Sequence, residues 1–246
     1  MTATFTARDP SDYAQRLAIV VPYRDRPDHL SRFLPHMSAY FERDKLDCAI
    51  RYSIHIVEQM GTATFNRGAV KNAGFLLARA NADYVCFHDV DYLPIWADYS
   101  FARRPTRLIW HGLDPEPDRA AFLGGVVALS VADVERINGY SNDYWEWGYE
   151  DDDLRERCRR AGLEIEFRDG TYRALPHEHH GLTLDGTPTA AAEDSARVFT
   201  GKLLQGAAGF GSEGISTLRF RVITTLQMQR NGVAQPHLLH HQIELL

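Results

Sequence analysis

The sequence has little cysteine, and its three thiols lie far apart in the chain. Cys48, Cys86 and Cys158 are odd in number and show no C-x-x-C spacing. This pattern excludes a disulfide framework and gives no sign of a cysteine-ligated zinc site. We expect all three residues to be reduced thiols in the protein core.

The sequence also lacks long apolar runs and an excess of positive charge. No stretch of about 18 uninterrupted apolar residues occurs, and the N-terminus holds no apolar run of signal-peptide length. The formal net charge of −6 argues against broad binding to nucleic acid or to an anionic membrane, although a local basic pocket can still hold a phosphate. These absences predict a cytoplasmic protein without a membrane anchor or a nucleic-acid partner.

What the sequence does contain is ordinary for a globular protein. Its 246 residues are 44% hydrophobic and 24% charged, so a packed core is expected. The length suits one large α/β domain or two small ones. Because the chain shows no internal repeat, low-complexity tract or clear linker, we expect a single domain over residues 1–246 with an elaborated C-terminal part.

Strand and helix patterns alternate along the first part of the chain. Apolar residues 17–21 predict a buried strand that ends at Pro22, and residues 49–59 alternate like a second strand. Helical spacing occurs over residues 27–44 and 66–80, and residues 83–94 predict a strand that runs into a short acidic loop and stops at Pro94. This β-α-β start predicts an α/β fold with a mostly parallel sheet and helices on its faces.

The second part of the chain is less regular. Residues 96–119 are rich in Pro, Arg and Asp and predict irregular structure. Further expected elements are a strand within 121–130, a short helix within 131–139, a helix from residue 151, a helix within 181–201 and a strand within 215–229.

Two aspartates follow the third predicted strand in the motif HDVD. Asp89 and Asp91 are two residues apart, so an extended segment projects both carboxylates to one side. Ligands of open α/β sheets bind at the carboxyl ends of strands, and paired carboxylates suit Mg²⁺ or Mn²⁺ bridging a diphosphate. A surface acidic pair without a ligand is the alternative for so short a motif.

A second set of candidate metal ligands lies in LPHEHHG. His177 and His179 also have a period of two, so both imidazoles face one way, whereas His180 points elsewhere. Two histidines and one aspartate leave room on an octahedral ion for phosphate oxygens or water, and mixed nitrogen and oxygen ligands favour Mn²⁺ over Mg²⁺. A solvated turn is the alternative. The remaining histidines near the C-terminus are expected on a solvated tail or a strand edge: His237, His240 and His241.

Basic residues follow two of the predicted strands. Arg24 and Arg26 lie in the loop after the first strand, and Arg67 lies where the second strand leads into a helix. Guanidinium groups match phosphate oxygens, whereas the alternative role is surface solubility. Phe65 can stack on a nucleobase, although a single phenylalanine is more often a core residue.

The motif YWEWGYEDDDL, residues 144–154, sets two tryptophans beside the acidic run from Glu150 to Asp153. The acidic start and basic end of residues 151–163 are typical of an ordinary helix. The tryptophans do not fit that account, because large rings beside Gly148 in a loop suggest a flat surface offered to a ligand.

Six segments carry the most specific signal: VPYRDR, FNRGAVKNAGF, HDVD, FLGGVVALS, INGYSNDYWEWGYEDDDL and HEHH. In their order and approximate spacing, over about residues 17–225, the chain resembles the β-1,4-galactosyltransferases. FLPHM and the H-x-H pair are most similar to the xylosylprotein galactosyltransferase branch. The absence of the membrane anchor of eukaryotic members is typical of a soluble, bacterial-type member.

The resemblance implies a GT-A fold, Mn²⁺ and inverting transfer of galactose from a UDP-sugar to an acceptor hydroxyl, with a β-1,4 linkage to a xyloside or another glycoside. It implies a nucleotide-sugar half over about residues 17–95 and an acceptor and metal half over about residues 96–246. Donor contacts would come from Pro22, Arg24, Arg26, Phe65, Arg67, Asp89, Val90 and Phe122. Metal ligands would be Asp91, His177 and His179. Acceptor contacts would come from Tyr144, Trp147, Gly148, Glu150 and Asp152, with Asp151 as the catalytic base.

A general base must take the proton of the acceptor hydroxyl, and the sequence leaves the pKa of Asp151 open. The neighbouring carboxylates raise this pKa, whereas the helix N-terminus lowers it.

The chain departs from the family pattern at three positions. Glu146 replaces the usual glycine between the tryptophans, and Tyr149 precedes the acidic run. Glu146 is expected to stiffen the hinge of a mobile loop over residues 142–149, or to shift it toward Gly148 or Gly139. Phe122 stands where galactose-specific relatives usually have tyrosine, a position that influences whether an N-acetyl group fits. Transfer of N-acetylgalactosamine by the same fold is therefore an alternative.

Two other classes of function use part of the same pattern. A metal-dependent phosphoesterase would use the same aspartate and histidine ligands with water as the nucleophile, but it would have no need of the paired tryptophans. A non-catalytic module that binds sugar nucleotides is disfavoured by the intact acidic run.

Overall fold

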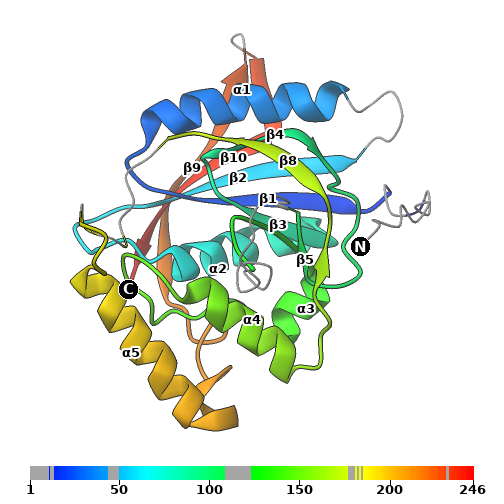
Figure 1. Ribbon diagram of the computed structural model, residues 1–246. Helices are drawn as coiled ribbons and strands as arrows, with labels where there is room; N and C mark the ends of the chain where they lie inside the picture. Colours follow the sequence, from blue (N-terminus) through cyan, green and yellow to red (C-terminus); the bar gives the residue numbers. More distant parts are fainter. Residues whose placement is uncertain are drawn as a thin grey trace.

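The computed structural model describes residues 11, 14–43, 50–108, 123–176, 181, 183, 185–230 and 233–246. The strands form an eight-stranded sheet of order β7-β5-β6-β3-β1-β2-β10-β9 and a two-stranded sheet of β4 and β8 (Figure 1). Strands β3, β1, β2 and β10 pair in parallel at the centre, and antiparallel pairs lie on both sides of them. This arrangement confirms the predicted α/β class, with a sheet that is mixed.

The central strand is β1, Arg16–Tyr23, which lies between β2, Arg51–Gln59, and β3, Tyr84–His88. The expectation that Pro22 ends this strand was wrong, because Pro22 pairs in register with Val57. Strand β1 pairs with β3 only from Leu17 to Val20. Beyond Val20 the strand has a neighbour on one side only, so the missing N–H of proline interrupts no ladder on the other side.

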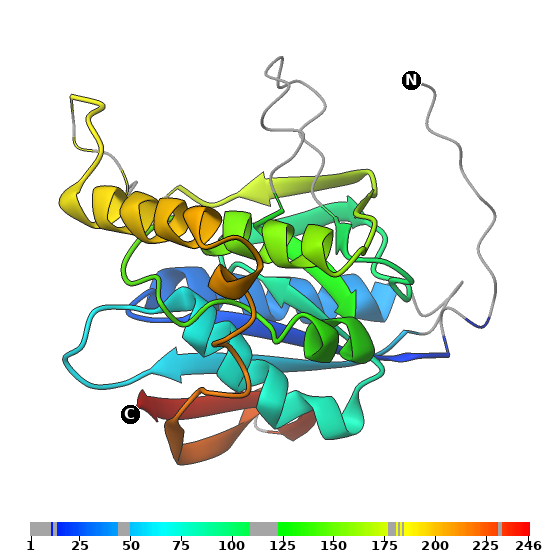
Figure 2. The same ribbon diagram turned by 90° about the horizontal axis from the view of Figure 1, so that it is seen from below.

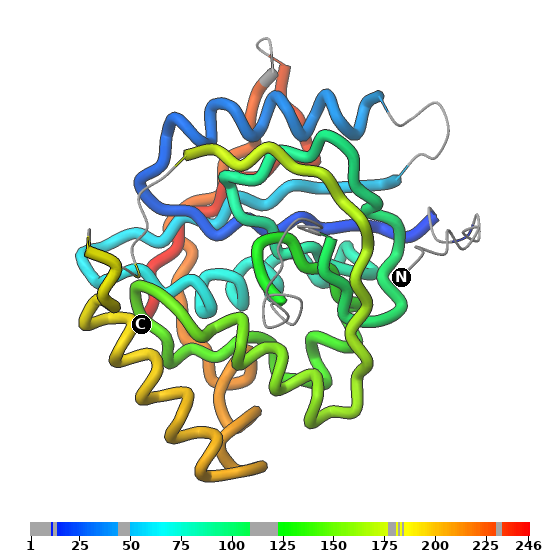
Figure 3. The backbone as a smooth tube through the Cα atoms, viewed as in Figure 1, coloured from blue at the N-terminus to red at the C-terminus, as the bar shows by residue number. Residues whose placement is uncertain are grey.

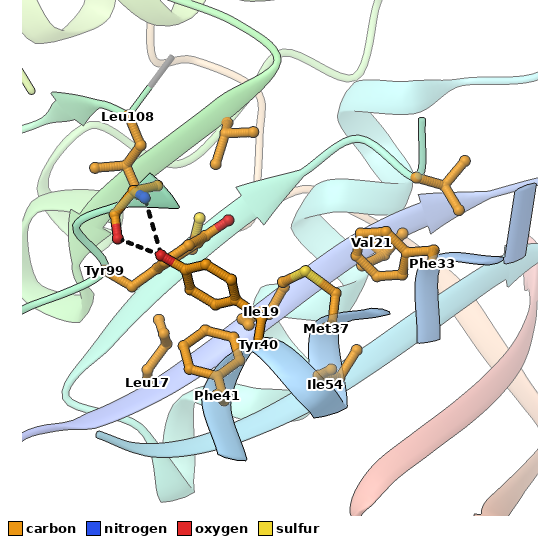
Figure 4. Packing of buried hydrophobic residues seen from close by; sticks show 14 of the residues in the cluster. Leu17, Ile19, Val21, Phe33, Met37, Tyr40, Phe41, Ile54, Tyr99 and Leu108 are labelled. Carbon is orange, nitrogen blue, oxygen red and sulfur yellow. Dashed lines mark hydrogen bonds between the residues drawn. The ribbon is translucent and has the colours of Figure 1, made fainter. Parts of the chain in front are cut away.

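One face of the sheet is covered by α1, Pro27–Arg43, together with β4, Tyr92–Ala97, and β8, Gly170–Ala174. Leu17, Ile19 and Val21 point into this layer, where they pack with the apolar face of α1 (Figure 4). The Tyr40 hydroxyl donates to the Ala97 carbonyl at 2.7 Å and accepts from the Ala97 N–H at 2.9 Å. These bonds fix α1 on the second sheet.

The opposite face is covered by α2, Arg67–Ala78, α3, Val131–Arg136, and α4, Glu150–Arg160 (Figures 1 and 2). Ala18 and Val20 contribute to the core beneath these helices. A Cβ atom at Gly74 would collide with the Val20 side chain, so glycine lets α2 approach the sheet closely. The start of α2 is thereby held close to the carboxyl ends of β1 and β2.

The remaining elements extend this frame. Strands β6, Val126–Ser130, β5, Thr106–Arg107, and β7, Glu166–Phe167, continue the sheet beyond β3. Helix α5, Ala190–Leu204, runs beside α4 toward the short helix η5, Gly206–Gly209, while η3, Arg79–Asn81, follows α2 (Figure 2).

The strand predicted over residues 83–94 is two strands in different sheets. Strand β3 ends at His88, and β4 begins at Tyr92 and continues past Pro94 to pair with β8. The expected stop at Pro94 was therefore wrong. A register shift lies between Pro94 and Trp96, and a two-stranded sheet leaves each strand one unpaired edge where proline is tolerated.

The C-terminal histidines lie in the sheet and not on a tail, which corrects the expectation from the sequence. Strand β9, Phe220–Arg230, confirms the predicted strand, and β10, Val233–Leu245, lies between β2 and β9. The His241 side chain is buried, and its Nε2 lies 3.0 Å from Nδ1 of His55. Burial lowers the pKa of both imidazoles, that of His55 to about 4, so the pair is neutral at physiological pH.

Two further expectations concern the thiols and the membrane. Cys86 and Cys158 are buried free thiols, as predicted, and Cys48 lies outside the described residues. Within the part of the chain that the structure describes, no helix is long and apolar enough to cross a bilayer.

Candidate active site

The candidate site lies at the carboxyl ends of the central parallel strands. Strands β1 and β2 run to the same side of the molecule, and α1 and α2 start from that side (Figure 3). Side chains that follow parallel strands therefore gather at one edge of the sheet, where ligands bind in folds of this class.

The start of α2 is tied to the loop that precedes the tryptophans. Asn66 caps the helix, with Oδ1 accepting from the Ala69 N–H at 2.8 Å, while its Nδ2 donates to the Asn142 carbonyl at 2.7 Å. Nearly two turns further, Asn72 Nδ2 donates to the Tyr140 carbonyl at 2.8 Å and its Oδ1 accepts from the Tyr140 N–H at 2.8 Å. These buried amides give residues 140–142 a defined place against α2.

The acidic run meets α2 through two ion pairs. Arg67 Nη1 lies 2.8 Å from Glu150 Oε1, and Lys71 Nζ lies 3.1 Å from Asp151 Oδ1. Arg67 and Lys71 are four residues apart on one face of α2, so they reach consecutive carboxylates in the first turn of α4. The acidic run is thus both the start of a helix and one side of a contact between two helices.

The two consecutive carboxylates have different protonation behaviour. Burial raises the pKa of Asp151 to about 7; Glu150 and Asp89 act in the same direction, against the opposite effect of Lys71 and Arg67. Burial also disfavours the charged form of Glu150, but Arg67 and Lys71 outweigh it and lower the pKa of Glu150. Glu150 therefore stays ionised at neutral pH, while Asp151 can exchange a proton there.

The loop from β3 to β4 carries the HDVD aspartates. The Asp89 N–H donates to the Gly125 carbonyl at 2.9 Å, and the charge of Asp89 acts on both Asp151 and Arg67. Asp91 is buried, and its carbonyl accepts from the Leu175 N–H at 2.7 Å. The side chain of Val90 lies in the core, so a contact of Val90 with a ligand would come from its backbone.

Pairing of β4 with β8 places the chain next to Asp91 beside residues that shortly precede the histidine motif in the sequence. Tyr92, next to Asp91, pairs with Ala174, and the chain continues through Leu175 toward residue 177. His177 and His179 themselves lie outside the described residues, as does Phe122.

The loop of residues 142–149, called the tryptophan loop below, is anchored at its base and exposed at its tip. Tyr144 is buried, and its hydroxyl donates to Asp153 Oδ2 at 3.0 Å. Trp145 and Trp147 are 42% and 37% exposed. A Cβ atom at Gly181 would overlap the Trp147 ring, so this ring lies directly against the chain just after the histidine motif.

Backbone geometry explains the unusual residue between the tryptophans. Glu146 has a φ of 66°, in the left-handed region that favours glycine, and its N–H donates to the Phe65 carbonyl at 2.7 Å. Tyr149 has a φ of 67° and Gly148 a φ of 98°. The tip of the loop therefore contains several positions at which glycine is conformationally preferred.

The candidate residues at the ends of β1 and β2 lie in these strands or in the segments that follow them. Arg24 donates to the carbonyls of Gly61 and Ala63, so its guanidinium braces the loop after β2. Pro22 is buried in β1, Arg26 is half-buried at the start of α1, and Phe65 packs on the edge of the core beneath α2. Asp152 is half-buried on α4, and burial is the main cause that raises its pKa.

Sequence reasoning missed two lysines of this region. Lys71 contacts Asp151, and its position one helical turn after Arg67 was a usable signal. Lys202 of α5 contacts Ser141 Oγ at 2.7 Å, Glu213 Oε1 at 2.8 Å and Asp143 Oδ2 at 3.0 Å, and so fixes α5 on the base of the tryptophan loop. No local sequence pattern predicts the role of Lys202, because Lys202 is far in the chain from the residues that it contacts at the base of that loop.

Comparison with known proteins gives two family matches that together cover most of the chain. Residues 6–101 match the N-terminal region of glycosyl transferase group 7, and residues 109–180 match a family described as the N-terminal domain of galactosyltransferase.

Individual relatives agree with these matches. Human β-1,4-galactosyltransferase 7 is 36% identical over 177 residues, covering 70% of this chain and 53% of the relative. Mouse β-1,4-galactosyltransferase 5 is 36% identical over 183 residues, 70% of this chain and 46% of the relative. Mouse β-1,4-galactosyltransferase 7 is 32% identical over 230 residues, 91% of this chain and 67% of the relative. The chain spans about half the length of the first two relatives.

Solved structures share the fold. The catalytic domain of Drosophila β-1,4-galactosyltransferase 7, in complex with xylobiose, superposes with a TM-score of 0.73 at 25% identity and covers 94% of each chain. A mutant of the fly enzyme, in complex with manganese, UDP-Gal and xylobiose, has the same TM-score of 0.73 at 24% identity. The GT-A fold expected from the sequence is therefore confirmed.

Proposed function

This chain belongs to the β-1,4-galactosyltransferase family, and we propose that it moves galactose from UDP-galactose to a hydroxyl of a glycoside with inversion at the anomeric carbon. The observation that carries this proposal is the state of Asp151. It is a buried carboxylate whose pKa is raised to about 7, it follows an exposed tryptophan pair, and it lies beside the edge of the sheet where a nucleotide would bind.

In the proposed reaction Asp151 is the general base. Its carboxylate accepts the proton of the acceptor hydroxyl while that oxygen bonds to the anomeric carbon, and the bond to the UDP oxygen breaks on the opposite face. Glu150, held ionised by Arg67, and Asp152 orient sugar hydroxyls as hydrogen-bond acceptors. The Trp147 ring provides an apolar platform for sugar C–H groups, next to Gly148 in a loop whose base holds the buried Tyr144.

The donor half of the site is proposed over about residues 17–95, and the acceptor and metal half over about residues 96–246. Support comes from the carboxyl ends of the parallel strands β1, β2 and β3, which lie at one edge of the sheet and lead into the segments that carry these residues. The proposed donor contacts are Pro22, Arg24, Arg26, Phe65, Arg67, Asp89, the backbone of Val90, and Phe122.

The chemistry of the donor set fits a divalent ion such as Mn²⁺. Asp91 supplies a buried carboxylate, and β8 carries the chain from Asp91's neighbour toward two histidines. Within the described part of the chain no three-ligand cluster occurs, so the set requires His177 and His179. When bound, Mn²⁺ would neutralise negative charge on the diphosphate. Manganese is also the ion in the complex of the fly enzyme.

For the acceptor we propose a xyloside. The support is the similarity to the fly enzyme, whose catalytic domain was solved with xylobiose, and the similarity to its human and mouse counterparts. Phe122 makes UDP-N-acetylgalactosamine the donor to compare with UDP-galactose.

The test is incubation of the protein with UDP-galactose and Mn²⁺, with and without an aryl β-xyloside, followed by analysis of all products. A β-1,4-galactosyl xyloside that forms only with both substrates is the expected result. Release of galactose 1-phosphate or phosphate without acceptor would assign a phosphoesterase, and binding without any product would assign a sugar-nucleotide-binding module. Parallel reactions with UDP-N-acetylgalactosamine and UDP-glucose measure donor selectivity.

A further inference from the structure

A buried lysine contacts the proposed catalytic base. The side chain of Lys71 is 2% exposed, and its Nζ lies 3.1 Å from Asp151 Oδ1. Lysine is almost never fully buried without a partner, because its charge loses the solvation of water. Most of the buried residues of α2 are small or apolar and pack on the sheet, so a buried lysine is unusual among them.

The ammonium group is held in one place by its surroundings. Its Nζ lies 4.4 Å from the centroid of the Tyr140 ring, an arrangement in which the ring face attracts a cation. The backbone of Tyr140 is locked to α2 by the two hydrogen bonds of Asn72. Lys71 therefore meets a fixed ring on one side and a carboxylate oxygen on the other.

We propose that Lys71 is a positioning residue for the transfer reaction: its ammonium holds Oδ1 of Asp151 and favours the ionised carboxylate, which leaves Oδ2 to receive the proton of the acceptor hydroxyl. This inference rests on the proposed function, since it assigns a task to Lys71 only if Asp151 is the base. Lys71 itself does not need to touch either substrate.

The charges around Asp151 decide how much Lys71 matters. A cation that hydrogen-bonds to a carboxylate favours its charged form, and Lys71 is the cation in direct contact. Without Lys71, burial and the charges of Glu150 and Asp89 would raise the pKa of Asp151, and only Arg67 of α2 would lower it. The ionisable groups whose charges interact with Asp151 are Lys71 and Arg67 of α2, Glu150 of α4, Asp89 of the loop after β3, Tyr92 of β4, and Tyr140.

A purely structural role predicts different behaviour from a positioning role. If Lys71 only fills space and donates a hydrogen bond to Asp151, its replacement lowers the stability of the protein and leaves the pH dependence of the reaction unchanged. If it holds the base in its ionised form, its replacement moves the acidic limb of the pH profile to higher pH. Lys202 of α5 offers a matched control. This mostly buried lysine lies 3.3 Å from Asp153, which is on α4 like Asp151, but it does not contact Asp151 itself.

The experiment compares the wild type with Lys71→Met, Lys71→Arg and Lys202→Met. Acceptor kcat and KM are measured between pH 5.5 and pH 9 with UDP-galactose, Mn²⁺ and an aryl β-xyloside, and donor Kd is measured by titration. For Lys71→Met we expect the acidic limb of kcat to move up by about one pH unit or more, with a loss of about fivefold or more at pH 7 that recovers at higher pH. Donor Kd should change by less than about twofold, and Lys71→Arg should retain the wild-type limb.

Several outcomes would overturn the inference. One is an acidic limb of kcat that does not move in Lys71→Met, as we expect for Lys202→Met, whose lysine does not contact the base. Another is an equal loss of donor binding and turnover. If Lys71→Met does not fold, the double variant Lys71→Met/Asp151→Asn should fold, because no buried charge is then left unpaired; failure of the double variant would assign Lys71 to packing alone.

Failure of the proposed function gives a different result from failure of this inference. If the wild type makes no galactoside, the function is wrong whatever Lys71 does. The contact between Lys71 and Asp151 is then still measurable, because the pH dependence of unfolding of Lys71→Met should show Asp151 titrating at higher pH than in the wild type. A wild type that makes the galactoside, together with an unmoved limb in Lys71→Met, rejects only the positioning role.

Discussion

Arg67 of α2 and Glu150 of α4 form an ion pair with an Nη1–Oε1 distance of 2.8 Å, so a residue proposed for the donor side contacts one proposed for the acceptor side. Glu150 is almost fully buried in this pair, whereas Arg67 retains partial exposure. Breaking a buried pair from one side leaves an uncompensated charge. The two proposed halves of the site are therefore coupled before any ligand binds, and substitutions in one half are expected to affect the other.

The first prediction concerns the base. Asp151→Asn should leave UDP-galactose affinity nearly unchanged and should lower turnover by about 100-fold or more, because general-base catalysis typically supplies that factor. Steady-state kinetics together with donor titration measure both quantities. Asp153→Asn is not a suitable control, because Asp153 also holds Arg157 and Tyr144; Asp152→Asn is the better comparison and should retain more activity. Near-normal turnover of Asp151→Asn would assign the base to another residue.

The same substitution should change how stability depends on pH. The pKa of Asp151 is about 7 in the folded protein, above its ordinary value of 3.8, so the folded state binds more protons than the unfolded state between these values. The contribution of Asp151 to the free energy of unfolding therefore falls as pH rises through this window. The difference between the melting temperature of Asp151→Asn and that of the wild type should therefore favour the variant more at pH 8 than at pH 5. Parallel melting curves would contradict a raised pKa.

The second prediction concerns the metal. His177→Ala and His179→Ala should each weaken Mn²⁺-dependent activity and raise the Mn²⁺ concentration needed for half-maximal rate. Metal binding by the wild type should fade below about pH 6, because imidazole must be neutral to bind a metal. His180→Ala is the matched control in the same motif and should retain wild-type Mn²⁺ dependence. Wild-type dependence in both His177→Ala and His179→Ala would remove the H-x-H pair from the metal site.

The third prediction concerns Trp147. Because its ring lies against Gly181 at the exposed tip of the loop, UDP with Mn²⁺ should perturb tryptophan fluorescence if this loop closes over the donor. Trp147→Ala should raise acceptor KM far more than it weakens donor affinity. Trp145→Ala provides the control, since it removes the neighbouring ring and leaves the contact with Gly181. Equal losses for donor and acceptor in Trp147→Ala, or no loss for either, would mean that the ring has only a packing role.

The fourth prediction concerns Glu146, whose φ of 66° is costly for a residue with a side chain. Glu146→Gly removes a left-handed penalty of about 1–2 kcal/mol and adds about 0.5–1 kcal/mol of chain entropy in the unfolded state, so it should stabilise the protein by up to about 1 kcal/mol. Transfer should continue with altered loop kinetics. Glu146→Ala tests the cause, because it removes the same side chain and keeps the penalty. Equal melting temperatures for both variants would exclude backbone strain as the explanation.

Much of the frame follows from local pattern. The apolar run of β1, the alternation of β2 and the helical spacing of α1 and α2 depend on residues close in the chain, and each was predicted within a few residues of its observed bounds. The acidic start and basic end of α4 were predicted in the same way. Local periodicity determines these elements because it decides which face of a segment can be buried.

Other features were decided only by contacts between distant segments. His241 was expected on a solvated tail or a strand edge, yet it lies in an inner strand against His55, 186 residues earlier in the chain. Strand β10 is an inner strand because β2 pairs with one of its edges and β9 with the other, and neither β9 nor β10 contains a local signal for this pairing.

The properties of Asp151 show the same division. Its place in the first turn of α4 was readable from the sequence, and so was the conflict between neighbouring carboxylates and the helix N-terminus. The direction of its pKa was not readable, because burial is the largest cause and burial exists only once α2 and α4 pack together. Lys71 lies 80 residues from Asp151 in the chain, and only that packing makes it the partner of the base. The chemical groups present at the site follow from the order of residues in the chain, whereas the packing of the folded chain sets how far each group is removed from water and which charge it faces.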